Sequence, residues 1–290
     1  MSLSSLCALL GKSRQAYYKQ FKEGYSAFTL SASVIDDVKA IRENQPRVGT
    51  IKLYESLKEG WKKKGLKVGR DRLYAILDAN HMLIRKRKRR STRTTFSNHS
   101  FTTAPDLYKD LIPTAPNQVY VSDITYIPIQ NGRFCYLFLV TDSYSKYIVG
   151  YKLAKSMRAR HAVEALMLAE GQRTTTETII HHSDRGIQYC CPEYVGYLKN
   201  HSYQQSNTQS SDPRDNAVAE RLNGTLKEEL IYPFGDIHDY EEAKERIEVA
   251  IKIYNTQRLH LSCGLQTPND VHRGVFKAIN LWKKSSCKLI

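Results

Sequence analysis

The pattern of hydrophobic positions divides the chain into a helical first part and a mixed second part. Up to about residue 84, apolar side chains recur every three or four positions, which predicts helices. Within residues 3–22 we expect two short helices around Gly11, the second with Ser13 as its N-cap. Three more helices are expected at 33–43, 51–61 and 70–82.

A basic turn, KKKGLKVG at 62–69, precedes the last of these helices. A helix-turn-helix of this kind places its second helix in the major groove of DNA. Arg70 and Arg72, at the start of that helix, are therefore candidate DNA contacts. A small helical bundle with a solvated polar face is the alternative explanation of the same pattern.

After residue 116 the pattern becomes extended. Apolar and polar residues alternate at 119–129, and Asn131-Gly132 is a strong signal for a hairpin turn. Strands and helices then alternate, which predicts an α/β domain with a mixed five-stranded sheet. The remaining strands are expected at 134–145, 146–154, 177–183 and 203–208, and the helices at 158–170, 192–200, 215–230 and 240–254.

The composition is that of an ordinary globular protein. The 290 residues are 41% hydrophobic and 25% charged, with a mean hydropathy of -0.50, and the length fits about two domains. No apolar run approaches the roughly 20 residues of a membrane span, and the start lacks a secretory signal, so we expect a cytoplasmic protein. Six cysteines without a C-x-x-C pair indicate reduced thiols. The doublets His181-His182 and Cys190-Cys191 have poor spacing for zinc.

Charge is concentrated at one end of the chain. The net charge is +15, and residues 1–100 hold 22 Lys and Arg against 8 Asp and Glu, or +14. This excess predicts binding to a polyanion. A run of cations follows the last predicted helix and is suited to phosphate contacts. Its members are Arg85, Lys86, Arg87, Lys88, Arg89 and Arg90. We expect a DNA-binding region at 1–84, a basic linker at 85–116, a catalytic core at 117–275 and a tail at 276–290.

Three acidic residues of the second part are placed where they could converge. Asp123 lies in mid-strand, Asp184 ends a strand, and Glu220 lies on a helix with Asn223 and Lys227 on the same face. Carboxylates from neighbouring strands and a covering helix suit Mg²⁺ or Mn²⁺, and two such ions can bind the oxygens of a phosphoryl transfer. Each acid taken alone is better explained as a surface group or a helix cap.

Together these residues resemble the DDE transposases of bacterial insertion sequences, whose ribonuclease-H-like core is shared with retroviral integrases. Asp184 and Glu220 enclose 35 residues, an interval typical of that family, and Asp123 precedes Asp184 by 60 intervening residues. The strings SDITYI, HSDRGIQY (182–189) and DNA (215–217) occur in the family's order. The C-terminal signature is matched by Tyr254, Asn255, Arg258, His260, Thr267 and Pro268.

This resemblance implies metal-dependent DNA strand cleavage and strand transfer at the ends of an insertion sequence. It implies that Asp123, Asp184 and Glu220 bind two ions of Mg²⁺ (or Mn²⁺), and that Lys227 contacts DNA close to them. The implied partners are double-stranded DNA, as element ends and as target, further copies of the chain on that DNA, and an upstream-frame helix-turn-helix protein that is fused or associated. A nucleoid-associated location follows.

The sequence departs from the family pattern at three places. Tyr120 stands where many relatives have Trp, Ser206-Asn207-Thr208 replaces a commoner Ser-Met-Ser, and Leu259 replaces a frequent Pro. None of these changes removes a candidate metal ligand. Two acids outside the motif, Asp142 and Asp212, are expected to be dispensable for catalysis.

Other functions explain less of the sequence. A DNA-binding regulator derived from a transposase would use the basic first third but would leave the carboxylates without a role. The string His182 to Arg185 also fits the H-x-x-R of tyrosine recombinases, but it follows a strand-like run. No G-x-S-x-G elbow is present for a hydrolytic triad.

Overall fold

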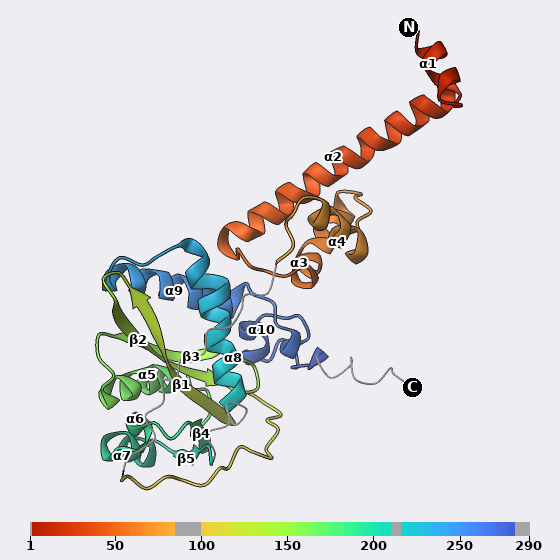
Figure 1. Cartoon of the computed structure of the whole chain (residues 1–290). Helices are drawn as coiled ribbons and strands as arrows, with labels where there is room; N and C mark the ends of the chain where they lie inside the picture. The colour runs from red at the N-terminus through yellow and green to blue at the C-terminus, as the bar shows by residue number, and fades with distance from the viewer. Residues whose placement is uncertain (1, 85–99, 210–215, 282–290) are drawn as a thin grey trace. The chain divides into compact units, whose positions relative to one another are not determined.

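Two separately packed units make up the chain, one at residues 1–86 and one at 87–290. The computed structural model describes residues 2–84, 100–209 and 216–281 (Figure 1). Within these residues, no helix is both long and apolar enough to cross a membrane. The first unit is helical and the second is built on a sheet, as the hydrophobic pattern predicted.

The helical unit begins with α1 and a long α2. Ser13 caps α2, because its Oγ accepts a hydrogen bond from the backbone N–H of Ala16 at 3.0 Å. The expected separate helices at 13–22 and 33–43 are wrong, since α2 runs without a break for 31 residues. Gly24 alone, without a proline nearby, costs only about 1 kcal/mol and does not end a helix. The four helices are α1 (Leu3–Leu9), α2 (Arg14–Asn44), α3 (Thr50–Lys63) and α4 (Arg70–Ala79).

The end of α2 packs with α3 and α4 around one apolar core. Leu53, Trp61, Leu73 and Leu77 are the largest of its fully buried side chains. The Trp61 indole N–H donates to Asp37 Oδ2 at 2.8 Å, which satisfies the polar edge of the ring. This unit therefore has a core of its own, independent of the sheet.

The second unit contains the expected mixed sheet. The strand order is β3-β2-β1-β4-β5, in which β1 pairs antiparallel with β2 and parallel with β4. Asn131 and Gly132 join β1 to β2 with φ angles of 64° and 68°, the left-handed conformation that a tight hairpin requires. The strands are β1 (Val119–Ile129), β2 (Arg133–Asp142), β3 (Ile148–Ala154), β4 (Ile179–Ser183) and β5 (Tyr203–Asn207).

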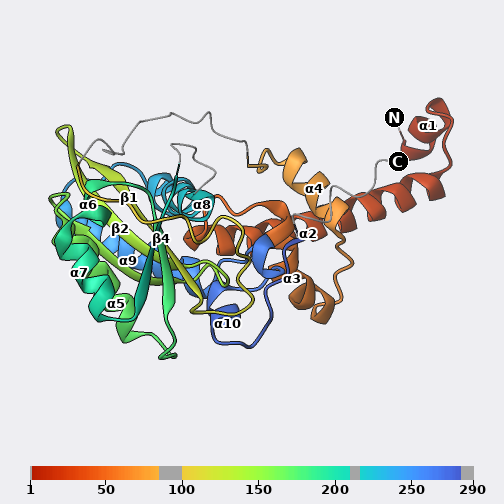
Figure 2. The same cartoon turned by 90° about the horizontal axis from the view of Figure 1, so that it is seen from below.

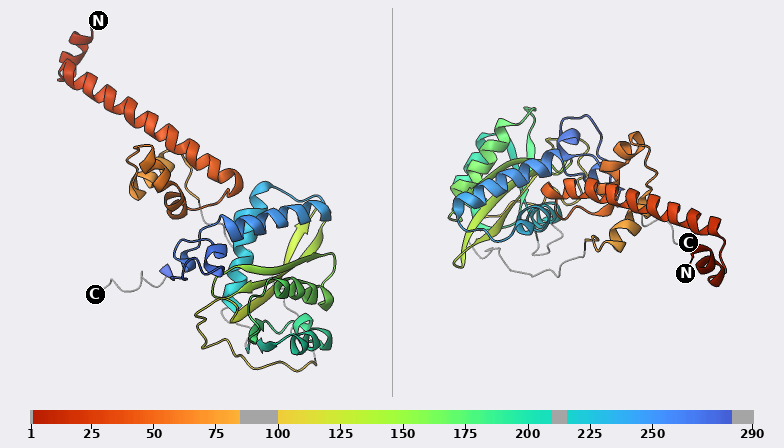
Figure 3. Two further views of the ribbon diagram at one scale, coloured as in Figure 1. Left: turned by 180° about the vertical axis from the view of Figure 1, so that it is seen from behind. Right: turned by 90° about the horizontal axis from the view of Figure 1, so that it is seen from above.

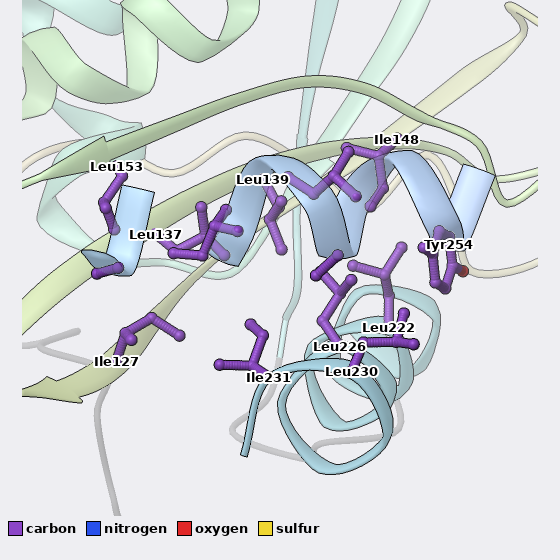
Figure 4. Close-up of a cluster of buried hydrophobic side chains, with 14 of the residues drawn as sticks. Ile127, Leu137, Leu139, Ile148, Leu153, Leu222, Leu226, Leu230, Ile231 and Tyr254 are labelled. Carbon is purple, nitrogen blue, oxygen red and sulfur yellow. The ribbon is translucent and has the colours of Figure 1, made fainter. Parts of the chain in front are cut away.

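Helices cover both faces of the sheet. On one face α5 (Ala159–Gly171) and α7 (Pro192–Asn200) lie side by side (Figure 2). On the other face lie α8 (Ala217–Thr225) and α9 (Tyr240–Thr256) (Figure 3). Together with the sheet they enclose an apolar cluster (Figure 4). A Cβ at Gly150 would lie 2.1 Å from the Ala165 carbonyl oxygen, so α5 can pack this closely only on glycine.

Several local features were not expected from the sequence. The helix predicted at 215–230 is wrong in its second half, where α8 gives way to a π-helix, η2 (Leu226–Ile231), and a 3₁₀ turn, η3 (Tyr232–Phe234). The structure also adds three short elements. They are α6 (Ile187–Cys190), η4 (Leu261–Cys263) and α10 (Pro268–His272).

Candidate active site

The sheet register brings the two aspartates together. Parallel pairing of β1 with β4 ends at Ser122 opposite Ser183. Asp123 is the next residue of β1, and Asp184 is the first residue after β4. Along β1, Asp123, Thr125 and Ile127 share one face, because successive side chains alternate. Ile127 belongs to the apolar cluster beneath α8 and α9, and this places Asp123 on the same side of the sheet.

The Asp123 carboxylate is half-buried and held by two hydrogen bonds. Its Oδ2 accepts from Asn223 Nδ2 at 2.6 Å, and its Oδ1 accepts from the Ile124 N–H at 2.9 Å. Burial raises the pKa of Asp123 to about 7, with further contributions from the negative charges of Asp184 and Glu220. Mutual repulsion among carboxylates is the electrostatic situation that a divalent cation relieves.

The Asp184 side chain is positioned by the turn that follows β4. Its Oδ1 accepts a hydrogen bond from the Gly186 N–H at 3.0 Å. A Cβ at Gly186 would lie 3.0 Å from that same oxygen, so a larger residue would press against the carboxylate. The glycine of the HSDRGIQY string therefore keeps room for Asp184.

Two asparagines connect helix α8 to β1 by hydrogen bonds. Asn216, at its N-cap, donates from Nδ2 to the Ser122 carbonyl at 3.0 Å, and Asn223 bonds to Asp123 as described above. Both asparagines are buried, and the Oδ1 of each has no hydrogen-bond partner among the residues that the structure describes. Glu220, between them on the helix, is exposed.

The donor set fits a hard divalent cation in its chemistry, since its members are carboxylates and amide oxygens. In the part of the chain that the structure describes, however, no three His, Cys, Asp or Glu side chains are grouped closely enough to hold one ion. Asp123 and Asp184 are neighbours in register, and the charge of Glu220 raises the pKa of Asp123. Glu220 thus influences the pair without completing a three-carboxylate cage.

Lys227 is directed at the same strand. It lies in the π-helix, half-buried, and its Nζ donates to Thr125 Oγ1 at 2.7 Å. Burial lowers the pKa of Lys227, and the negative charges of Asp123 and Glu228 act in the opposite direction. Because Thr125 is two residues from Asp123 on one face of β1, the ammonium and the carboxylate share that face. From the sequence, α-helical spacing predicts that Lys227 shares one face with Glu220. That spacing does not apply in the π-helix, which nevertheless directs Lys227 at β1.

The expected DNA contacts fall into two groups. Arg70 and Arg72 are exposed on the first turn of α4; Arg70 pairs with Asp71 at 2.9 Å, and Arg72 donates to the Lys67 carbonyl at 3.3 Å. The six cations from Arg85 to Arg90 lie outside the described residues.

Two residues of the C-terminal signature, Asn255 and Arg258, have structural roles that the sequence did not indicate. Asn255 accepts from the Ile148 N–H and donates to the Ile148 carbonyl, at 3.0 and 3.1 Å. Arg258 is buried and makes two hydrogen bonds to Glu229 of the π-helix, at 2.8 and 2.9 Å. The signature thus ties the end of α9 to β3 and to the segment that carries Lys227.

Two family models match the second unit. Both are described as integrase core domains, and they match residues 113–213 and 201–268. The class of protein is therefore one with an integrase core domain. The catalytic core of HTLV-2 integrase in complex with magnesium is 15% identical, with a TM-score of 0.44, over 55% of this chain and 97% of that chain.

Whole-chain relatives narrow the class. The chain is 34% identical to an uncharacterized 31 kDa protein of insertion element IS600 from Shigella sonnei, over 91% of this chain and 96% of that protein. It is 28% identical to the transposase for IS629 of Shigella sonnei, over 82% and 77% of the two chains. The chain belongs to the insertion-sequence transposases with an integrase core, which are polynucleotidyl transferases.

Proposed function

We propose that this transposase cuts and joins DNA strands at a site formed by Asp123, Asp184 and Glu220. The observation that carries the assignment is the register of β1 and β4, which makes Asp123 and Asp184 adjacent, together with the raised pKa of Asp123. Such carboxylates are suited to Mg²⁺ or Mn²⁺. When bound, two ions would stabilise the attacking and leaving oxygens of an in-line phosphoryl transfer.

The residues around the carboxylates have separate tasks in this proposal. Asn223 holds Asp123 through Oδ2, and Gly186 holds Asp184 through Oδ1, so both carboxylates are oriented before substrate arrives. Glu220 would join them from α8 when DNA and cation are bound. Lys227 would exchange its bond to Thr125 for a phosphate of the element end.

DNA recognition is assigned to the first unit and the cations after it. Arg70 and Arg72 are exposed at the start of α4, the helix that a helix-turn-helix places in the major groove. Arg85 to Arg90 would contact phosphates without reading sequence. Binding of double-stranded DNA would keep the protein on the nucleoid.

We also propose assembly of several copies on DNA. An insertion sequence has two ends, and joining both to a target needs a set of carboxylates at each end. An upstream-frame helix-turn-helix protein would be an additional partner. Light scattering of the full chain with and without element-end DNA would measure the number of copies. A single copy on DNA carrying two ends would contradict this part of the proposal.

The direct test compares carboxylate variants in a strand-joining assay with purified full-length protein, element-end DNA and Mg²⁺ or Mn²⁺. Asp123→Asn, Asp184→Asn and Glu220→Gln keep the side-chain shape but remove the charge, and an amide nitrogen is no ligand for a hard cation. We expect joining to fall by about 10³-fold or more and DNA binding to stay within about twofold. Joining without a divalent cation, or by the Asp184→Asn protein, would contradict the proposal.

The controls must be acids without a structural role. Asp142, expected to be dispensable, is a poor control because it is completely buried. Its carboxylate accepts hydrogen bonds from Asn117 N–H and from Ser145 at 2.7 Å. Asp212 lies outside the described residues. Exposed Asp110 and Glu245 are matched alternatives, and Asp110→Asn and Glu245→Gln should join DNA as the parent does.

A further inference from the structure

A five-residue segment that precedes β1 in the sequence lies along the edge of the sheet. We call residues 104–108 the strap; the sequence assigned them to the linker, but they contact the α/β unit, which they border along β5 (Figure 1). The Leu107 N–H donates to Ser206 Oγ at 2.9 Å, and Tyr108 packs beside Val119 and Val121. The strap is therefore part of the folded second unit.

Asn207, the last residue of β5, connects the strap to the end of β4. Its Oδ1 accepts from the Ala104 N–H at 2.9 Å, on the strap side. Its Nδ2 donates to Ser183 Oγ at 3.1 Å and to the Asp184 carbonyl oxygen at 3.2 Å, on the active-site side. One amide group thus bridges the strap and the backbone of Asp184.

The surroundings of Asn207 leave it no alternative arrangement. Its side chain is fully buried, and its Oδ1 also accepts from Gln205 Nε2 at 3.2 Å, so both ends of the amide are used. Turning the amide over would set Nδ2 against the Ala104 N–H and Oδ1 against the Asp184 carbonyl, which pairs donor with donor and acceptor with acceptor. The bridge therefore has one orientation.

We propose that Asn207 is a positioning residue, which fixes the backbone of Asp184 from the strap and so places the Asp184 carboxylate for cation binding. This inference rests on the proposed function of Asp184. The Asp184 carbonyl is held from two sides, by Asn207 Nδ2 and by Ser183 Oγ, while the Gly186 N–H holds its carboxylate. Docking of the strap and the geometry of the cation site are then linked through one side chain.

The decisive variant is Asn207→Leu, which keeps the branching of the side chain at Cγ and removes every hydrogen bond of the amide. The measurement is the dissociation constant for Mn²⁺ alone, by electron paramagnetic resonance on the full chain without DNA. Loss of a residue that orients a metal ligand typically costs 10–100-fold in metal affinity or activity. We expect the Mn²⁺ dissociation constant to rise by about that factor. In the joining assay kcat should fall while KM for element-end DNA stays within about twofold, since the DNA contacts are untouched.

Two further variants separate positioning from general stability. Ala104→Pro removes the N–H that donates to Asn207 and should shift the Mn²⁺ constant in the same direction, by a smaller factor. Gln209→Ala removes hydrogen bonds from Nε2 to the backbone carbonyls of Ala104 and Asn207, at 3.0 and 3.1 Å, but leaves the Asn207 amide in place. It should leave the Mn²⁺ constant within about twofold. The double variant Asn207→Leu/Ala104→Pro should be no weaker than Asn207→Leu, because both act through one bridge.

Asp184→Asn is the reference in the same experiment. If it lowers Mn²⁺ affinity and Asn207→Leu does not, the positioning role is refuted while the proposed function stands. If Asp184→Asn leaves Mn²⁺ binding unchanged, the proposed function itself fails. Should Asn207→Leu not fold, Ala104→Pro decides alone, and an unchanged Mn²⁺ constant there overturns the inference.

Discussion

The two units bury different kinds of residue. Among the described residues of the helical unit, Thr50 is the one buried polar side chain. Most of its cations are exposed, although Arg42 is half-buried and donates to the Met82 carbonyl at 2.8 Å. The α/β unit buries many polar groups, and several surround the aspartates: Ser122, His181, His182, Ser183, Ser206, Asn207, Asn216 and Asn223. Buried polar groups require partners and specify one arrangement, whereas exposed cations can contact any phosphate. The comparison suggests precise geometry for the chemistry and adaptable contact for binding.

The largest effect that would test this comparison is on DNA affinity. Replacing Arg85 to Arg90 by neutral polar residues should weaken binding by about 10³-fold at low salt and reduce the salt slope by about 5, because six phosphate contacts are lost. Preference for element ends over random DNA should persist. The dissociation constant for DNA would be measured between about 50 and 200 mM salt, where the loss of phosphate contacts changes affinity strongly. An unchanged salt dependence of DNA affinity would contradict the proposal that these six cations contact phosphates.

The next effect concerns the α/β unit alone. Arg258→Ala leaves Glu229 of the π-helix without its buried partner, and breaking such a pair costs about 3 kcal/mol. We expect the unfolding transition of the second unit to shift, with DNA affinity through the first unit unchanged. Exposed Arg273→Ala is the control. A shift in both units would show that the two are not energetically separate.

A smaller effect is expected at Lys227. Lys227→Ala should reduce joining and end binding by about 10-fold, because one charged phosphate contact is lost, and should leave Mn²⁺ affinity near that of the parent. Exposed Lys244→Ala on α9 should have no effect. Unaltered joining by the Lys227 variant would assign this lysine to the packing of the π-helix against β1.

The last prediction concerns the pH dependence of stability. The pKa of Asp123 is about 7 in the folded protein against 3.8 as the ordinary value, so the folded state binds more protons between these pH values. Without a cation, stability should therefore decrease as pH rises from about 4 to 7, and Asp123→Asn should lose this part of the dependence. Cation affinity should rise over the same range, because the cation competes with the proton. Thermal unfolding with and without Mn²⁺ measures both.

Much of the fold follows from the sequence because strands and helices have distinct periods. The hairpin at Asn131-Gly132, the five strands and most helices are where the pattern put them. The π-helix was missed because apolar residues at 222, 226 and 230 fit an α-helix as well. The strap was assigned to a linker because its backbone bonds to Ser206 and Asn207 join residues about 100 positions apart, which no local pattern encodes.

The carboxylates of the candidate site could be predicted from the sequence, but the residues that orient them could not. Asp123 and Asp184 could be named from strand positions, since the ends of parallel strands meet at one edge. The partners that orient them, such as Asn207, and the buried role of Asp142 depend on contacts between distant segments. Glu229 was not singled out, because nothing in its own helix distinguishes it from the exposed acids nearby.

The pairing of β1 with β4 sets a strict limit on how this gene can vary in length. Sixty residues separate Asp123 from Asp184, yet only four paired positions, from Val119–Ile180 to Ser122–Ser183, bring them together. A codon lost within β4 would turn its side chains to the opposite face of the sheet. A codon lost at Thr174 to Thr176, outside the strands, would shorten a connection and leave the pairing intact. Deletions in related elements should therefore accumulate in that connection and be absent from the strands.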